Sequence, residues 1–228
     1  MQRKIWSLCL GISIMLIACS GTTKGGESSI LSGTISGLQP QQLYLFDLLK
    51  QRQGPVDTAF VDENGSFAFD FKPVKKGFYR ITITQQYTFV LPLLMGEEVR
   101  ILGDVNQLQD IQISGTADAE RMHLFNKFLG ENGARAQALE QEFQQYVNSP
   151  KRDSILMVFR ARYQSLEEER LAKMKSLIDE DPGLFSNLAI MEQMPKEGAE
   201  NLAYYKKVDD ALAAEYGDSP FYQSFHNQ

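Results

Sequence analysis

The sequence is poor in cysteine and histidine, and this scarcity excludes several kinds of catalytic and metal site. Only two of its 228 residues are cysteines and only two are histidines. Cys9 and Cys19 form no Cys-x-x-Cys pair, so the sequence holds neither a thioredoxin-type redox motif nor a cysteine zinc site. His-Glu-x-x-His, Gly-x-Ser-x-Gly and a glycine-rich phosphate loop are missing as well. We therefore expect no cofactor, no bound metal and no catalytic residue.

The sequence also lacks a surplus of positive charge. It has 23 Lys and Arg against 29 Asp and Glu, a formal net charge of −6 at pH 7. Nucleic acids bind to basic patches, so we expect no nucleic-acid partner. The composition is 43% hydrophobic and 11% aromatic, which is typical of a globular protein with a buried core.

Residues 1–18 have the features of a bacterial lipoprotein signal peptide. Arg3 and Lys4 precede a mostly apolar run over residues 5–17, which is too short to span a bilayer comfortably. The tetrapeptide Leu-Ile-Ala-Cys at 16–19 resembles the lipobox of bacterial lipoproteins. In that class the cysteine is diacylated on sulfur, the peptide is cut just before it, and the new N-terminus is acylated. An ordinary secretory signal with a chance cysteine, or an uncleaved anchor, are the alternatives.

Residues 19–29 are rich in Gly, Ser and Thr and are expected to form a flexible tether. Cys19 is the expected lipidation site, and its acyl chains, for example palmitate, would each contribute about 0.8 kcal/mol per buried methylene to membrane binding. Ten tether residues span about 17–19 Å root-mean-square. The tether has no acidic cluster of the kind that marks surface export, so we expect a lipid-anchored, periplasm-facing protein of the cell envelope.

Residues 30–115 alternate between apolar and polar side chains with period two, which predicts an antiparallel β domain of the sandwich type. Phe67, Phe69 and Phe71 share one strand face, and core packing explains them better than a ligand groove does. Asn64-Gly65 predicts a hairpin turn, and Pro92 predicts an edge strand or a bulge. About eight strands are expected, near residues 30–37, 43–49, 56–61, 66–71, 78–84, 87–94, 98–102 and 111–114.

Residues 116–228 change to an apolar period of about 3.6, which predicts a helical segment and, with the strands, an α+β fold. A long helix is expected between residues 153 and 178, ended by Asp181-Pro182-Gly183, and Arg170 interrupts its apolar stripe. Gly217 predicts a helix stop, and Ser219 with Pro220 predicts a new helix start. The apolar positions expected to face the core of this segment are Met122, Phe125, Phe128, Leu129, Leu139, Phe143, Tyr146, Leu156, Phe159, Tyr163, Leu166, Met174, Leu177, Leu202, Tyr205, Val208, Leu212 and Tyr216.

The last predicted helix begins well and stops at Gln228 without a C-cap. This pattern fits two situations equally, a short terminal helix that docks on the bundle or a longer precursor.

The strand region resembles a bacterial domain of unknown function. The residues that carry the resemblance are SGTISGL, LYLFD, VDTAFVDENGSFAFDF, GFYRITI and GEEVRILGD, within about 30–115. That domain typically precedes a thioredoxin-like domain of the AhpC/TSA type in envelope thiol-disulfide oxidoreductases, and residues 116–228 look like the connector. The Trp-Cys-x-x-Cys site of those enzymes has no counterpart here. The resemblance therefore implies an accessory module with a thioredoxin-like partner.

Other candidate residues have ordinary structural interpretations. His123 and His226 are single histidines on predicted helices, without a motif around them. Glu167, Glu168 and Glu169 point about 100° apart on a helix and cannot share one ion, so a solvated face with a Glu169–Lys173 pair is expected. Similar solvated faces are expected for Glu97-Glu98 and Asp209-Asp210. One of Tyr204 and Tyr205, beside Lys206 and Lys207, is expected to face the bundle.

Three short segments match glycosylation tripeptides. Asp57-Thr58-Ala59 and Asp153-Ser154-Ile155 resemble an O-glycosylation acceptor of some bacterial envelopes, and Asn64-Gly65-Ser66 fits the N-glycosylation pattern. Tripeptides occur by chance, and the hairpin turn alone explains the third.

The sequence supports three functional hypotheses. The first is a non-catalytic envelope lipoprotein that binds or positions a partner. The second is an N-terminal fragment or subunit of a thioredoxin-like thiol-disulfide oxidoreductase whose catalytic domain lies elsewhere. The third is a glycan- or peptide-binding lipoprotein.

Overall fold

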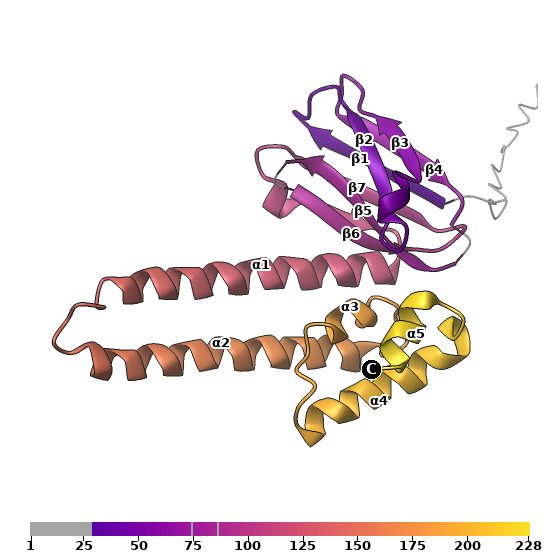
Figure 1. Cartoon of the computed structure of the whole chain (residues 1–228). Helices are drawn as coiled ribbons and strands as arrows, with labels where there is room; N and C mark the ends of the chain where they lie inside the picture. Colours follow the sequence, from indigo (N-terminus) through magenta and orange to yellow (C-terminus); the bar gives the residue numbers. More distant parts are fainter. Residues whose placement is uncertain (1–28, 74, 86) are drawn as a thin grey trace, which may run out of the picture.

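The structure is a computed structural model that describes residues 29–73, 75–85 and 87–228. Within these ranges eight strands are followed by five α-helices, which confirms the predicted α+β fold (Figure 1). Cys19, the signal peptide and residues 19–28 of the tether lie outside the described residues. Ser29, assigned to the tether from the sequence, is instead the buried first residue of β1.

The strands form two four-stranded sheets that pack face to face as a sandwich. Their orders are β4-β1-β7-β8 and β3-β2-β5-β6. The β1–β7 ladder is parallel, whereas the other described ladders are antiparallel. The chain crosses to the second sheet between β1 and β7, so these two neighbours are not joined by a hairpin. The strand bounds are β1 Ser29–Ser36, β2 Gln42–Asp47, β3 Asp57–Phe60, β4 Ser66–Phe71, β5 Gly77–Thr84, β6 Tyr87–Leu93, β7 Glu98–Asp104 and β8 Gln112–Ser114.

The sandwich core has the alternation that the sequence predicts. Phe67, Phe69 and Phe71 of β4 are buried on one face, and they pack in the same cluster as Ile81 and Ile83 of β5. Burial of each such side chain contributes about 1.5–3 kcal/mol relative to leaving it exposed. The phenylalanine row is therefore core, as expected, and lines no ligand groove.

The predicted turn at residues 62–65 is present, but it joins strands of different sheets. Gly65 has a φ of 79°, and a side chain there would place its Cβ 2.1 Å from the Ile35 carbonyl oxygen. The Asp62 side chain accepts hydrogen bonds from the Asn64 and Ser66 amides, both at 2.8 Å. After the turn β4 pairs with β1, and β3 pairs with β2, so the expected β3–β4 hairpin ladder is wrong.

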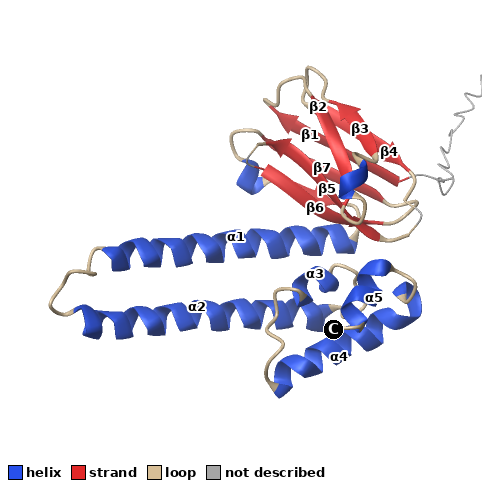
Figure 2. Cartoon of the chain, viewed as in Figure 1, coloured by secondary structure: helices blue, strands red, loops and turns tan. Residues whose placement is uncertain are grey.

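The α-helices come after β8 in the chain, and Figure 2 shows them together below the strands. Gly217 follows α4 as predicted, although its φ of −54° is right-handed. A Cβ there would lie 2.6 Å from the Ala213 carbonyl oxygen, so close approach rather than conformation favours glycine. Ser219 is the N-cap of α5, but its hydroxyl makes no capping bond. The helix bounds are α1 Ala117–Gln144, α2 Arg152–Glu180, α3 Asn187–Met191, α4 Ala199–Tyr216 and α5 Pro220–His226.

The helices have their own core, which reaches the sandwich through β5 and β6. Phe78 of β5 points away from the sandwich core and packs with Phe185, at a ring-centroid distance of 5.1 Å. Phe125 of α1 and Met174 of α2 are buried in the same cluster. The outer face of the β3-β2-β5-β6 sheet is therefore partly covered by helices.

The distal end of the α1–α2 hairpin extends beyond the sandwich (Figure 1). Its small cluster has three buried members, Leu139, Phe159 and Leu166. Tyr163, expected in the core, is 51% exposed, and Leu202 of α4 is 55% exposed. Among the described residues, no helix combines the length and apolar character needed to cross a membrane.

Candidate functional site

A cleft of about 900 Å³ lies between the sandwich and the helices. Its walls include the strand β6 and the helix α1, which also contact each other. Residues of α3 and α5 complete it, so the cleft exists only because segments far apart in the sequence come together. No motif in the sequence predicted it.

The interior of the cleft is apolar. Phe78 and Val90 contribute from the sheet, Leu129 from α1, and Phe221 and Phe225 from α5. The Phe78 and Phe221 rings meet edge to face with their centroids 5.0 Å apart. All five belong to, or pack against, the helical core. The cleft is therefore an opening in a packed apolar layer, a typical setting for ligand binding.

The rim of the cleft is polar. Asp110 and Lys127 face each other with 4.0 Å between carboxylate and ammonium, and Glu131 and Glu192 add two exposed carboxylates. His123 is half-buried, and burial lowers its pKa. The charge of Lys127 lowers this pKa further and outweighs the opposing backbone hydrogen bond with Ile111. His123 is therefore neutral at pH 7, and the rim has a net negative charge.

A buried ionic cluster holds α1 against the sandwich beside the cleft. The Lys76 ammonium is 3.0 Å from the Asp118 carboxylate and also pairs with Glu97. The second Asp118 oxygen accepts a hydrogen bond from the Ser186 amide at 2.7 Å. Lys76 and Asp118 are only about 4–5% exposed, so these charges depend on one another for solvation. The prediction of a solvated face at Glu97 is wrong, because Lys76 lies 21 residues away in the sequence.

Arg121, one turn after Asp118 in α1, contacts the C-terminus of α2. Its guanidinium donates to the carbonyls of Leu177 and Asp181, the latter at 2.8 Å, and lies 3.3 Å from Asn187 Oδ1. These carbonyls accept no hydrogen bond within α2, and the buried Arg121 guanidinium donates to them instead. Its positive charge also interacts favourably with the negative end of the α2 helix dipole. Burial lowers the pKa of Arg121, while Glu180 and Asp181 oppose that shift.

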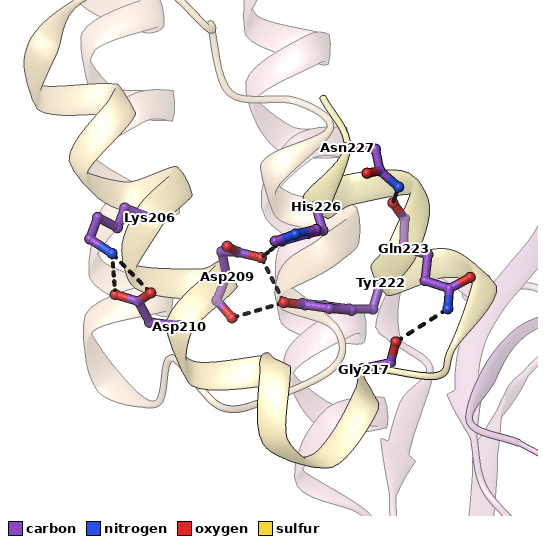
Figure 3. A network of polar contacts seen from close by, with 8 residues as sticks. All are labelled: Lys206, Asp209, Asp210, Gly217, Tyr222, Gln223, His226 and Asn227. Atoms are coloured by element: carbon purple, nitrogen blue, oxygen red, sulfur yellow. Dashed lines mark hydrogen bonds and ion pairs between the residues drawn. The ribbon is translucent and has the colours of Figure 1, made fainter.

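Asp209 of α4 contacts Tyr222 and His226 of α5 (Figure 3). The same helix supplies Phe221 and Phe225 to the cleft. The Asp209 carboxylate accepts a 2.8 Å hydrogen bond from the Tyr222 hydroxyl and lies 2.8 Å from His226 Nδ1. Burial raises the pKa of Asp209, but the bonds from His226 and Tyr222 outweigh it and the net shift is downward. Asp209 is thus a structural anchor, contrary to the solvated face predicted for it, whereas Asp210 pairs at the surface with Lys206.

The two histidines that the sequence singled out lie in different places. His123 is on the cleft rim, and His226 binds Asp209 on α5. The two histidines therefore do not form a common site. Within residues 29–73, 75–85 and 87–228, no three His, Cys, Asp or Glu side chains are grouped to hold a metal ion.

Glu167, Glu168 and Glu169 each contact a different partner. Glu167 pairs with Arg170 at 2.7 Å, and Glu168 accepts a 2.8 Å hydrogen bond from Gln164. Glu169 pairs at 2.7 Å with Arg135 of α1, not with Lys173 as predicted. Of the three glutamates, Glu169 therefore links α2 to α1, while Glu167 and Glu168 have partners within α2.

The remaining candidates have structural roles. Tyr205 faces the bundle and donates to the carbonyls of Met191 and Met194, which confirms that one tyrosine of the pair does so. Tyr204 donates to Asp179 at 2.8 Å, and Lys207 pairs with the same carboxylate. Asp57 accepts from the Thr58 and Asp70 amides at 2.7 and 3.0 Å, which links β3 to β4.

Part of the chain matches a known domain family. Residues 29–122 match the family described as Domain of unknown function (DUF4369). The match covers the sandwich and the start of α1, so it includes β6 but neither α3 nor α5. The predicted resemblance to a domain of unknown function is thereby confirmed for this segment. Comparisons with curated proteins and with solved structures gave no match.

Proposed function

We propose that this chain is a non-catalytic, lipid-anchored binding protein of the cell envelope, and that its cleft holds an apolar segment of a partner. The cleft carries the proposal. Its volume, about 900 Å³, is at the upper end of the roughly 300–1,000 Å³ of ordinary ligand sites. Its apolar interior and polar rim are typical of ligand-binding sites.

The membrane part of the proposal rests on the sequence. The charged start, the apolar run and the lipobox-like tetrapeptide ending at Cys19 are in register. The tether then gives the folded part reach from the lipid surface. A thioredoxin-like protein is the partner that the resemblance of the strand region implies.

The cleft is tested with two glycines on the same helix. Gly130 lines the cleft and Gly133 does not, and a Cβ added at either would have no atom within 4 Å. We expect Gly130→Trp to fill the cleft and Gly133→Trp to leave it open. The chain from residue 19, with Cys19→Ser to prevent lipidation, is titrated with the uncharged apolar dye N-phenyl-1-naphthylamine.

Saturable dye fluorescence is expected for the parent and for Gly133→Trp. The dissociation constant should rise by at least about tenfold in Gly130→Trp, a loss of about 1.4 kcal/mol. Equal affinity of the two tryptophan variants, or no saturable binding by the parent, would refute the cleft as a binding site.

The anchor and the absence of catalysis are tested separately. Labelled palmitate should be incorporated into the protein in cells, and Cys19→Ser should abolish the label; persistence of the label would show that the lipobox interpretation is wrong. Purified protein should not reduce insulin disulfides, because Cys19 is the only cysteine of the chain after the signal peptide. Measurable turnover would contradict the non-catalytic assignment.

A further inference from the structure

The cleft wall β6 is an edge strand. Among the described residues it has one neighbour, β5, because the sheet order is β3-β2-β5-β6. The presence of Pro92 in β6 is consistent with an edge position, because proline lacks an amide hydrogen and within sheets is confined to edges and bulges. An edge strand offers unpaired amide and carbonyl groups to any extended chain that reaches it.

The register shows which backbone groups of β6 face the free edge. Phe78 of β5 lies opposite Pro92 of β6. The Phe78 carbonyl accepts a 3.0 Å hydrogen bond from the Leu48 amide, so it points away from β6. Phe78–Pro92 is therefore a non-hydrogen-bonded pair of the β5–β6 ladder. Because such pairs alternate with hydrogen-bonded ones, Arg80–Val90 and Thr82–Thr88 are non-bonded too. The amides and carbonyls of Thr88 and Val90 thus point away from β5.

The free edge faces the cleft. Five consecutive residues, 87–91, line it, and at about 3.3 Å per residue they span about 17 Å. Side chains of consecutive strand residues point to opposite faces, so an unbroken run along the wall means that the strand edge itself borders the cleft. The helix α1 packs against β6, and where it lines the cleft its Gly130 and Ala134 are small residues that leave room for another chain.

The charges around the cleft indicate which kind of peptide it can bind. Asp110, Glu131 and Glu192 give three carboxylates, and Lys127 is paired with the first of them. His123 is neutral at pH 7. Two carboxylates, at Glu131 and Glu192, are thus left to attract positive charge, while Phe78, Val90 and Phe225 favour apolar side chains.

We propose that the cleft binds an extended peptide segment of alternating apolar and Lys or Arg residues, which adds a strand to the free edge of β6. Amides and carbonyls of the segment pair with Thr88 and Val90. Its apolar side chains enter the aromatic interior, and its cations meet Glu131 and Glu192. This mode of recognition is β-strand addition, and it rests on the proposed binding function of the cleft.

The experiment uses the chain from residue 19 with Cys19→Ser and a fluorescein-labelled octapeptide, (Val-Lys)₄. Saturable binding by anisotropy is expected, with at least about tenfold weaker binding of (Val-Glu)₄. Glu131→Gln combined with Glu192→Gln should reduce the affinity for (Val-Lys)₄ and its dependence on salt. Equal binding of the two peptides, or no binding of (Val-Lys)₄, would overturn the proposal.

Backbone pairing is tested with matched variants of Thr88. Thr88→Pro removes the amide hydrogen at the free edge, whereas Thr88→Val keeps it, and both remove the hydroxyl contact with Thr82. We expect Thr88→Pro to weaken (Val-Lys)₄ binding at least about tenfold more than Thr88→Val does. Equal affinity of the two folded variants would overturn strand addition.

Hydrogen exchange on the parent chain gives an answer that depends on no variant. On peptide binding, the Thr88 and Val90 amides should exchange at least about tenfold more slowly. The Phe89 and Leu91 amides already bond to β5 and should change little. Unchanged exchange at Thr88 and Val90 in the bound state would overturn the proposal.

The dye titration separates this inference from the proposed function. If the dye binds and Gly130→Trp blocks it, but the peptide does not pair with β6, strand addition is wrong and the binding cleft stands. If neither dye nor peptide binds, both fail.

Discussion

The sandwich and the distal half of the α1–α2 hairpin bury their apolar residues in different ways. In the sandwich, every strand contributes to one continuous core that includes Phe69 and Ile81, each 0% exposed. In the distal hairpin, three buried residues are surrounded by surface ion pairs such as Arg162–Glu142 at 2.9 Å. Surface pairs contribute little to stability, so the hairpin tip depends on its attachment to the rest. The cleft lies between the sandwich and the first half of α1, together with α3 and α5, and not at the distal hairpin.

The largest difference should appear when each core loses one phenylalanine. Phe69→Ala should lower the free energy of unfolding by about 3–5 kcal/mol, because the site is fully enclosed. Phe159→Ala should cost about half as much or less, since its neighbours Phe143 and Ile155 are only partly buried. Urea unfolding followed by circular dichroism measures both. Equal losses would contradict the contrast between the two cores.

The junction between the sandwich and the start of α1 should be nearly as sensitive. Lys76→Met leaves Asp118 and Glu97 without their buried counter-ion, and we expect a loss of about 3 kcal/mol. The neighbouring Lys75→Met removes an exposed pair with Asp218 and should cost about 0–1 kcal/mol. The same urea series compares them, and similar losses would show that the buried cluster does not hold the junction.

A smaller, opposite effect is expected within α1. Gly130→Ala and Gly133→Ala should each stabilise the protein by about 0.5–1 kcal/mol, because glycine is a poor helix former and neither site is crowded. Amide hydrogen exchange in the distal hairpin should slow in both variants. Unchanged exchange there would mean that the hairpin opens elsewhere than at the glycines.

The smallest effect should come from pH at α5. The folded-state pKa of Asp209 lies below its usual value, so its contribution to stability is present above the unfolded pKa of about 3.9 and is lost as pH falls through the folded pKa. Asp209→Asn should therefore flatten the acid side of the melting profile, whereas Asp210→Asn should change it less. Thermal unfolding between about pH 3 and 6 tests this, and identical profiles would contradict the role of Asp209.

Much of the sandwich was predictable because strand periodicity is local. The phenylalanine row of β4, the alternation of β5 and the restriction of Pro92 to an edge strand or a bulge all follow from neighbouring residues. The pairing of strands does not, which is why the turn at 62–65 was correctly found and its two strands were wrongly paired. The parallel β1–β7 ladder likewise depends on contacts about 70 residues apart.

The polar network was less predictable for the same reason. Glu97 is one of two adjacent glutamates, and only the folded chain brings Lys76 and Asp118 to it. Asp209 resembles Asp210 in sequence, yet one binds Tyr222 and His226 while the other meets solvent and Lys206. Burial and partner distance decide the role of a charged residue, and neither is encoded in its immediate neighbours.

The sequence by itself determined the order of strands and helices, the restriction of Pro92 to an edge strand or a bulge, and the acidic balance, since these depend on local periodicity, a missing amide and composition. Only the tertiary structure decided that β6, α1, α3 and α5 enclose a cleft, because its walls come from segments up to about 140 residues apart. Cleft formation needs the ionic cluster at Lys76 and the anchor at Asp209 to hold those walls in place. The proposed binding site therefore depends on tertiary packing and not on any local sequence motif.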